Sequence, residues 1–69
     1  MAIPIRYRIL RHITEEPSSV DVLAAQVGKS KSTVRAALRR LKADGLDIHR
    51  DWYGEAREYR YTLRKGMGQ

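Results

Sequence analysis

The spacing of apolar residues along the chain changes once, from a helical period to an alternation. Up to Gly45, apolar side chains recur every three or four residues, the spacing that gives an α-helix one apolar face. The third such stretch is the clearest, because Val34, Leu38 and Leu41 form a single apolar stripe. This pattern predicts three helices, over residues 4–14, 19–27 and 31–44.

Residues that favour helix ends lie at the predicted boundaries. Pro4 suits the first turn of the first helix, and Pro17 ends that helix because the residue before a proline is steered away from helical angles. Serine can cap a helix start, and glycine readily adopts the left-handed conformation that follows a helix end. The candidates are Ser18 or Ser19 before the second helix, Ser30 or Ser32 at the third, and Gly28 and Gly45 after them.

Beyond Gly45, apolar and polar residues alternate, which is typical of β-strands. Residues 46–64 are predicted to form a hairpin in which Gly54 and Glu55 make a two-residue turn, with glycine at positive φ. The expected strand pairs are Ile48 with Tyr61 and Leu46 with Leu63, all four facing the helices. The side chains expected to leave the core and meet a partner are Arg50, Trp52, Arg57 and Tyr59.

The length and composition predict one small domain. With 69 residues, we place this domain at residues 1–64 and expect 65–69 to be a flexible tail. The predicted fold class is mainly α with a C-terminal β-hairpin. The chain has no cysteine, and neither His12 nor His49 has a second ligand at metal spacing, so we expect no disulfide, metal or cofactor.

The chain is strongly basic. Its formal net charge is +6 at pH 7 and its isoelectric point is about 10.2. Such a charge attracts DNA, RNA, an anionic membrane surface or an acidic protein, and by itself does not choose among them. Residues 28–45 hold six cations and no anion before Asp44; the cations are Lys29, Lys31, Arg35, Arg39, Arg40 and Lys42.

The face of the third helix opposite its apolar stripe combines small residues with cations. At about 100° per residue, it holds Ser32, Ala36, Arg39 and Ala43, with Arg35 at one edge and Thr33 and Arg40 at the other. Small side chains let a helix backbone approach a grooved polyanion closely, whereas the bland alternative is an ordinary solvated face.

Other function classes find little support in the sequence. No plausible Ser, His and Asp set, phosphate-binding glycine loop or small-molecule substrate pocket is evident, so we expect no enzyme and no catalytic residue. No apolar run is long enough for a membrane span or a signal peptide. We therefore expect a soluble cytoplasmic protein, associated with the nucleoid when bound to DNA.

The order of helices, glycine turn, basic helix and hairpin resembles the winged helix-turn-helix family. The similarity is closest to the small domain at the start of biotin operon repressors and related bacterial regulators. It is carried by residues 18–48, SSVDVLAAQVGKSKSTVRAALRRLKADGLDI, and the whole likeness extends over roughly residues 5–64. In that family the second helix of the motif enters the DNA major groove.

The resemblance implies roles for the cations and hydroxyls of the third helix. Arg35 or Arg39 would bond guanine edges, and Ser32 and Thr33 would bond a phosphate or a base edge. Free N–H groups at the helix start attract a phosphate beside Lys29, Ser30 and Lys31. The full expected set is Lys29, Ser30, Lys31, Ser32, Thr33, Arg35, Ala36, Arg39, Arg40 and Lys42, with Arg40 and Lys42 on the DNA backbone.

The resemblance also implies a wing, the hairpin tip at residues 50–57. Its expected DNA contacts are Arg50, Trp52, Tyr53 and Arg57. Asp51, Glu55 and Glu58 place anions near this tip, where phosphate would repel them, so the tip alternatively touches protein. Trp52 fits an interface hot spot, or else caps the core beneath the hairpin.

The leading hypothesis is a sequence-specific double-stranded DNA-binding protein, a small bacterial or phage transcriptional regulator. The alternative is a winged-helix interaction module, from a phage or an accessory factor, that binds an acidic protein. Useful specificity favours a homodimer on two half-sites or attachment to another protein, although few apolar residues are available for self-association. A domain cut from a larger regulator stays open, and RNA ranks lower because no aromatic sheet platform is apparent.

Overall fold

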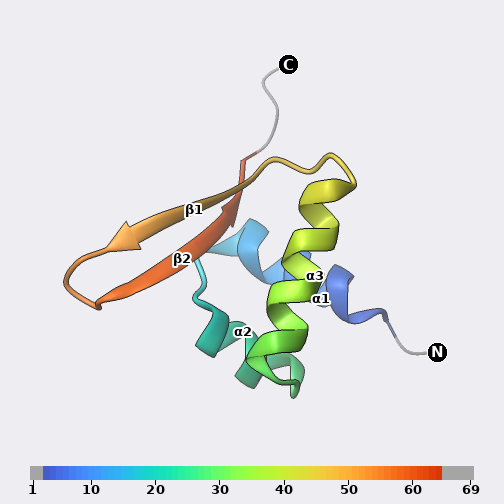
Figure 1. The fold of residues 1–69 in the computed structure, drawn as a ribbon, viewed down its shortest axis with the longest axis horizontal. Coiled ribbons are helices and arrows are strands. Elements are labelled where there is room, and N and C mark those ends of the chain that lie inside the picture. The colour runs from blue at the N-terminus through green and yellow to red at the C-terminus, as the bar shows by residue number, and fades with distance from the viewer. Residues whose placement is uncertain (1–2, 65–69) are drawn as a thin grey trace.

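Three helices are followed by an antiparallel hairpin in the computed structural model, which describes residues 3–64 (Figure 1). The elements are α1 (Ile5–Glu15), α2 (Val20–Val27), α3 (Lys31–Ala43), β1 (Ile48–Tyr53) and β2 (Glu58–Leu63). The predicted fold class is confirmed: the protein is mainly α with a C-terminal hairpin, the arrangement of a winged helix-turn-helix domain. The expected flexible tail, residues 65–69, lies outside the described residues.

The helix ends follow from local chemistry. The Ser19 hydroxyl accepts a hydrogen bond from the Val22 N–H at 3.1 Å, and the Ser30 hydroxyl accepts one from the Thr33 N–H at 3.2 Å. These two serines, and not Ser18 or Ser32, are therefore the caps. Gly28 and Gly45 follow α2 and α3 with φ of 68° and 98°, the left-handed region that glycine adopts readily.

The first helix begins one residue later than its proline suggested. Pro4 occupies the N-cap position, just outside α1, and its carbonyl accepts hydrogen bonds from the N–H groups of Tyr7 and Arg8. At the other end, Glu16 is the C-cap and has an extended backbone, as expected for a residue that precedes proline.

The core is built mainly from the helices, with α3 packed against both α1 and α2. Its buried apolar residues are Ile9, Ile13, Leu23, Val27, Val34, Leu38, Leu41 and Ile48. Leu46, Tyr61 and Leu63 are partly buried against this cluster. The base of the hairpin therefore faces the helices with the four side chains that the alternation predicted.

The predicted hairpin register is wrong by two residues. Ile48 pairs with Leu63 and Trp52 with Tyr59, because the turn has four residues, 54–57, where two were expected. Arg57 adopts the positive φ, 54°, that had been assigned to Gly54. Side chains on a strand alternate with a period of two, so a shift of two residues keeps the side chains that remain in the strands on their predicted faces. Arg57, expected beside Trp52 and Tyr59, is instead in the turn.

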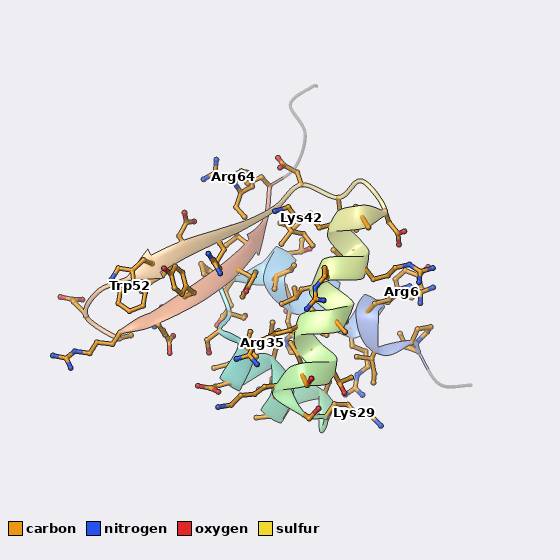
Figure 2. The ribbon with its side chains drawn as sticks, viewed as in Figure 1. Arg6, Lys29, Arg35, Lys42, Trp52 and Arg64 are labelled. Carbon is orange, nitrogen blue, oxygen red and sulfur yellow. The ribbon has the colours of Figure 1, made fainter. Side chains whose placement is uncertain are left out.

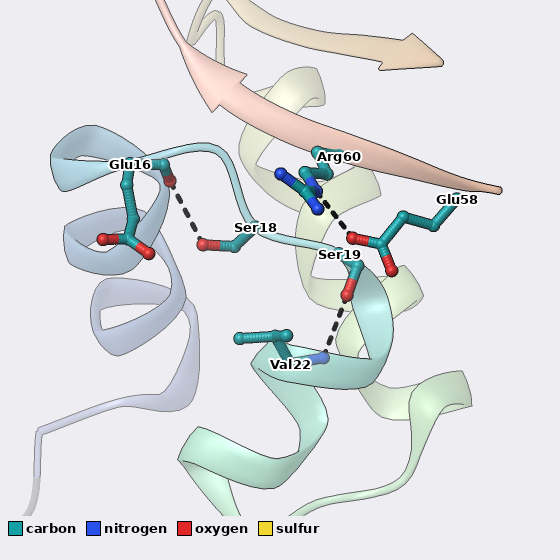
Figure 3. Close-up of polar contacts among 6 residues, drawn as sticks. All are labelled: Glu16, Ser18, Ser19, Val22, Glu58 and Arg60. Carbon is teal, nitrogen blue, oxygen red and sulfur yellow. Dashed lines mark hydrogen bonds and ion pairs between the residues drawn. The ribbon is translucent and has the colours of Figure 1, made fainter. Parts of the chain in front are cut away.

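A segment between α1 and α2 fastens the hairpin to the helices. Ser18 forms a β-bridge with Tyr61: the Ser18 N–H donates to the Tyr61 carbonyl at 3.1 Å, and the Tyr61 N–H donates to the Ser18 carbonyl at 2.8 Å. The Ser18 hydroxyl donates to the Glu16 carbonyl at 3.1 Å, while the neighbouring Ser19 caps α2 (Figure 3). Both serines are buried. This attachment sets where the hairpin stands relative to α3.

We predict that Gly28→Ala destabilises the protein by about 1 kcal/mol, because an L-residue is strained at positive φ. A Cβ at Gly28 would meet no atom within 4 Å, so backbone strain is the only cost expected. Gly54→Ala is the matched control, since Gly54 lacks positive φ and an added Cβ would lie 3.7 Å from Trp52 Nε1, an ordinary contact. Urea denaturation measures both, and equal losses would disprove the assignment of strain to Gly28.

Candidate nucleic-acid interface

The cations of α3 are arranged along the side of the helix that faces β1. Arg35, Arg39 and Lys42 stand four and three residues apart, so they share one side of the helix. Figure 2 shows Arg35 and Lys42 on the side of α3 toward the hairpin, and Arg6 on the other side. These three cations and Arg50 of β1 line an open groove of about 660 Å³ between α3 and the hairpin.

Packing against the core orients both walls of this groove. The buried stripe of Val34, Leu38 and Leu41 fixes the rotation of α3, so the cationic side lies next to the hairpin. On the opposite wall, the Arg50 guanidinium lies 4.2 Å from the centre of the Tyr59 ring. Such a cation–π contact holds the guanidinium in place without neutralising it.

The groove carries more positive than negative charge. Its one carboxylate, Asp47, accepts a hydrogen bond from His49, with 2.8 Å between Asp47 Oδ1 and His49 Nε2. Among residues 3–64, no carboxylate lies within 4.0 Å of the cationic groups of Arg35, Arg39 or Lys42. Unpaired cations close together raise the potential of a groove, so this one attracts an anion.

Two of the predicted DNA-binding cations are paired within the protein. Lys31 Nζ lies 2.7 Å from Asp21 Oδ1, and Arg40 Nε lies 3.6 Å from Asp44 Oδ1. All four side chains are exposed, and exposed pairs are worth at most about 1 kcal/mol, so a phosphate can compete for either cation. Lys31 lies near Arg35 at the start of α3, where both line a second groove. Arg40 lies on another side of the helix and points away from both grooves.

The remaining predicted residues of the basic segment do not line the groove. Ser32 and Ala36 lie on the exposed face of α3, and Thr33 lies at its far edge, where its hydroxyl is 3.0 Å from that of Ser30. The Ser30 hydroxyl also serves as the helix cap. Lys29 is exposed in the turn before α3 (Figure 2). The structure thus separates a groove-lining group of cations from an outward face of small residues.

The hairpin has two chemically different faces. Its inner face, defined as the one continuous with the core-packed residues, carries Arg50, Trp52 and Tyr59 beyond the helices. Trp52 is 56% exposed, so the reading of Trp52 as a cap on the core is wrong. Of the other expected wing contacts, Tyr53 lies on the outer face beneath Arg60, at 4.4 Å, and Arg57 lies in the turn.

The acidic residues of the wing do not line the groove between α3 and β1. Asp51 and Glu58 lie on the outer face by strand alternation, and Glu58 Oε2 pairs with Arg60 Nε at 2.6 Å (Figure 3). Glu55 stands exposed in the turn. Of the three anions expected near the tip, only Glu55 therefore lies in the turn itself.

Sequence reasoning missed the contribution of His49 to the groove. Alternation places His49 on the outer face of the hairpin, where no contact with the groove is expected. Its side chain still lines the groove, because β1 is the strand next to α3. The bridge between Ser18 and Tyr61 holds β2 beside the segment between α1 and α2, and this leaves β1 as the strand next to α3. No local signal in the sequence showed this bridge.

Other kinds of site are not seen in residues 3–64. In that part of the chain no three His, Cys, Asp or Glu side chains are grouped as metal ligands would be. None of the helices described there combines the length and apolar character needed to cross a membrane.

Comparison with known protein families gives one match. A family model described as a helix-turn-helix domain matches residues 1–50. That range contains α1, α2, α3 and the start of β1, and therefore every cation of the groove. Searches of curated proteins and of solved structures found no match.

The groove predicts a binding site for simple anions. Inorganic phosphate titrated into the labelled protein should shift the NMR signals of Arg35, Arg39 and Arg50 more than that of Arg40, because Arg40 is paired and points away. Chloride at the same ionic strength is the control for screening. Equal shifts at Arg40 and in the groove would contradict the charge distribution described above.

Proposed function

Because the chain belongs to the helix-turn-helix domain family, whose members bind DNA, we propose that it is a sequence-specific double-stranded DNA-binding protein. We further propose that it is a small bacterial or phage transcriptional regulator working in the cytoplasm on the nucleoid. The observation that carries the proposal is the groove between α3 and the hairpin, where cations from two elements that have no carboxylate partner among residues 3–64 face the same space.

In this proposal α3 lies in the major groove, which is wide enough to admit an α-helix. Ser32, Ala36 and Ala43 are small and exposed, so they allow the α3 backbone to come close to the base edges. Arg39 projects beside them, and a guanidinium in that position can donate two hydrogen bonds to guanine O6 and N7. Arg35, one turn earlier, is the second candidate for base reading.

Contacts to phosphate position the helix on both sides of the DNA groove. At the start of α3, Lys29, Lys31 and the free N–H groups near Ser30 meet one strand, aided by the helix dipole. At its end, Arg40 and Lys42 meet the other strand. These contacts supply affinity and orientation, whereas base contacts supply specificity.

The wing extends the surface beyond α3. Arg50 shares the groove with Arg35 and faces the same partner, so it reaches the DNA backbone flanking the segment read by α3. One such helix reads only a few base pairs. We therefore propose that the protein acts as a homodimer on two half-sites, or attached to another factor, to gain specificity.

Selection from a random double-stranded DNA library at two salt concentrations tests the proposal. Enrichment of a motif that persists at the higher salt is expected, because base contacts are less sensitive to salt than phosphate contacts. A palindromic motif would indicate the homodimer. Binding only at low salt, without any motif, would disprove sequence-specific recognition.

Substitutions in α3 should separate base reading from phosphate binding. We predict that Arg39→Ala weakens binding to the selected site about tenfold or more, since a bidentate base contact is lost. The ratio of the affinities for the selected site and for random DNA should fall as a result. Lys42→Ala should weaken both DNAs alike and reduce the salt slope by about 1. Fluorescence anisotropy measures both variants, and equal losses on the two DNAs for Arg39→Ala would show that Arg39 does not read bases.

A charge reversal at the wing tip tests whether the tip lies against DNA. Glu55 is exposed and, within residues 3–64, has no cation within 4.0 Å. Reversing the charge of its side chain therefore disturbs no ion pair in this part of the chain. Glu55→Lys should strengthen DNA binding a few-fold at low salt, because it replaces a repelled charge with an attracted one. Glu16→Lys, at the end of α1 and away from the groove, is the control for net charge, because among residues 3–64 Glu16 likewise has no cation within 4.0 Å. No gain for Glu55→Lys over this control would place the wing tip away from DNA.

A further inference from the structure

The inner face of the wing carries two exposed aromatic rings, so the expectation that the sheet has no aromatic platform is wrong. Trp52 is 56% exposed and Tyr59 is 46% exposed, and neither belongs to the buried core. Trp52 lies near the tip of the hairpin, away from the helices (Figure 2). Exposing so much aromatic surface is unfavourable in water, so these rings are suited to a partner that covers them.

The rings are held in a fixed arrangement. Trp52 and Tyr59 are directly opposite each other on the two strands, with ring centres 4.9 Å apart and planes inclined at 61°. Arg50 lies on Tyr59 at 4.2 Å, and Trp52 Nε1 lies beside the turn at Gly54. The stacking surface, defined as Arg50, Tyr59 and Trp52, is therefore ordered before any partner arrives, which reduces the entropy lost on binding.

The charge around the stacking surface indicates what it binds. The inner face of the hairpin has a cation, Arg50, and no carboxylate, whereas Asp51 and Glu58 lie on the outer face. A second groove joins this face to the start of α3, with Arg35, Arg50 and Tyr59 among its lining. Its two carboxylates, Asp21 and Glu58, are each paired, with Lys31 and Arg60. A partner with a flat apolar face and a negative charge fits this surface, and a nucleotide has both.

We propose that the stacking surface binds an unpaired base, so that the protein prefers DNA in which a duplex passes into a single strand. This inference rests on the proposed DNA binding by α3. Within a duplex each base is covered by its neighbours, so a ring can stack only on a base that has left the pair or lies beyond the duplex end. Base–aromatic stacking of this kind combines with basic grooves in proteins that bind single strands.

The experiment compares three DNAs that carry the same duplex: one blunt, one with a short thymidine extension and one with an abasic extension of equal length. The abasic strand keeps the phosphates and removes the bases, so it isolates stacking from charge. We expect the thymidine extension to bind about tenfold more tightly than the abasic one, the equivalent of about 1.4 kcal/mol. Trp52→Ala should abolish this preference for the thymidine extension, and Trp52→Phe should retain part of it.

Trp52 is the only tryptophan in the chain, so its fluorescence reports on the stacking surface directly. Quenching is expected with the thymidine extension and not with the abasic one. Tyr7→Ala removes an exposed aromatic of α1 that also lies beside an arginine, and as the control it should keep the thymidine preference.

Equal binding of the thymidine and abasic extensions by the unaltered protein would overturn the inference, as would a preference that survives Trp52→Ala. If the blunt duplex is bound in either case, DNA binding by α3 stands and only the stacking site fails. If none of the three DNAs is bound, both proposals fail together.

Discussion

The apolar stripe of α3 is the contact on which the rest of the structure depends. Val34, Leu38 and Leu41 are buried against α1, α2 and the base of the hairpin, so they fix the rotation of α3 about its axis. Burial of such side chains contributes roughly 1.5–3 kcal/mol each, more than any exposed ion pair on the surface. Because the rotation is fixed, the cationic side of α3 faces the hairpin. The packing of the core therefore determines where the groove lies.

Most of the helical structure could be predicted because its signals are local. A serine before a helix and a glycine after it act through neighbouring backbone groups, and Ser19, Ser30, Gly28 and Gly45 occupy those positions in the structure. The hairpin register is different, since it depends on the length of the turn. Gly54 looked like the residue with positive φ, yet Arg57 has it, and arginine gives no sequence signal for that conformation.

The candidate site was predictable in composition and less so in arrangement. The basic character of α3 is plain in the sequence, but which of its cations are paired with carboxylates is not. Lys31 pairs with Asp21 of α2, and this pair depends on how α2 and α3 cross. The pair of Arg40 with Asp44 has the four-residue spacing of a helical ion pair and could have been foreseen. Asp51, Glu55 and Glu58 lie close together in the sequence, although strand alternation already separates Asp51 from Arg50.

Helix and wing are not independent surfaces. Arg35 of α3 and Arg50 of β1 line both the groove beside β1 and the groove beside the stacking surface, so a partner held in one lies against residues of the other. The distance between these arginines depends on how the hairpin docks on the helices, and the Ser18–Tyr61 bridge is a backbone contact that fixes this docking. A backbone contact between Ser18 and Tyr61, neither of which is charged, therefore helps to set the geometry of the binding surface.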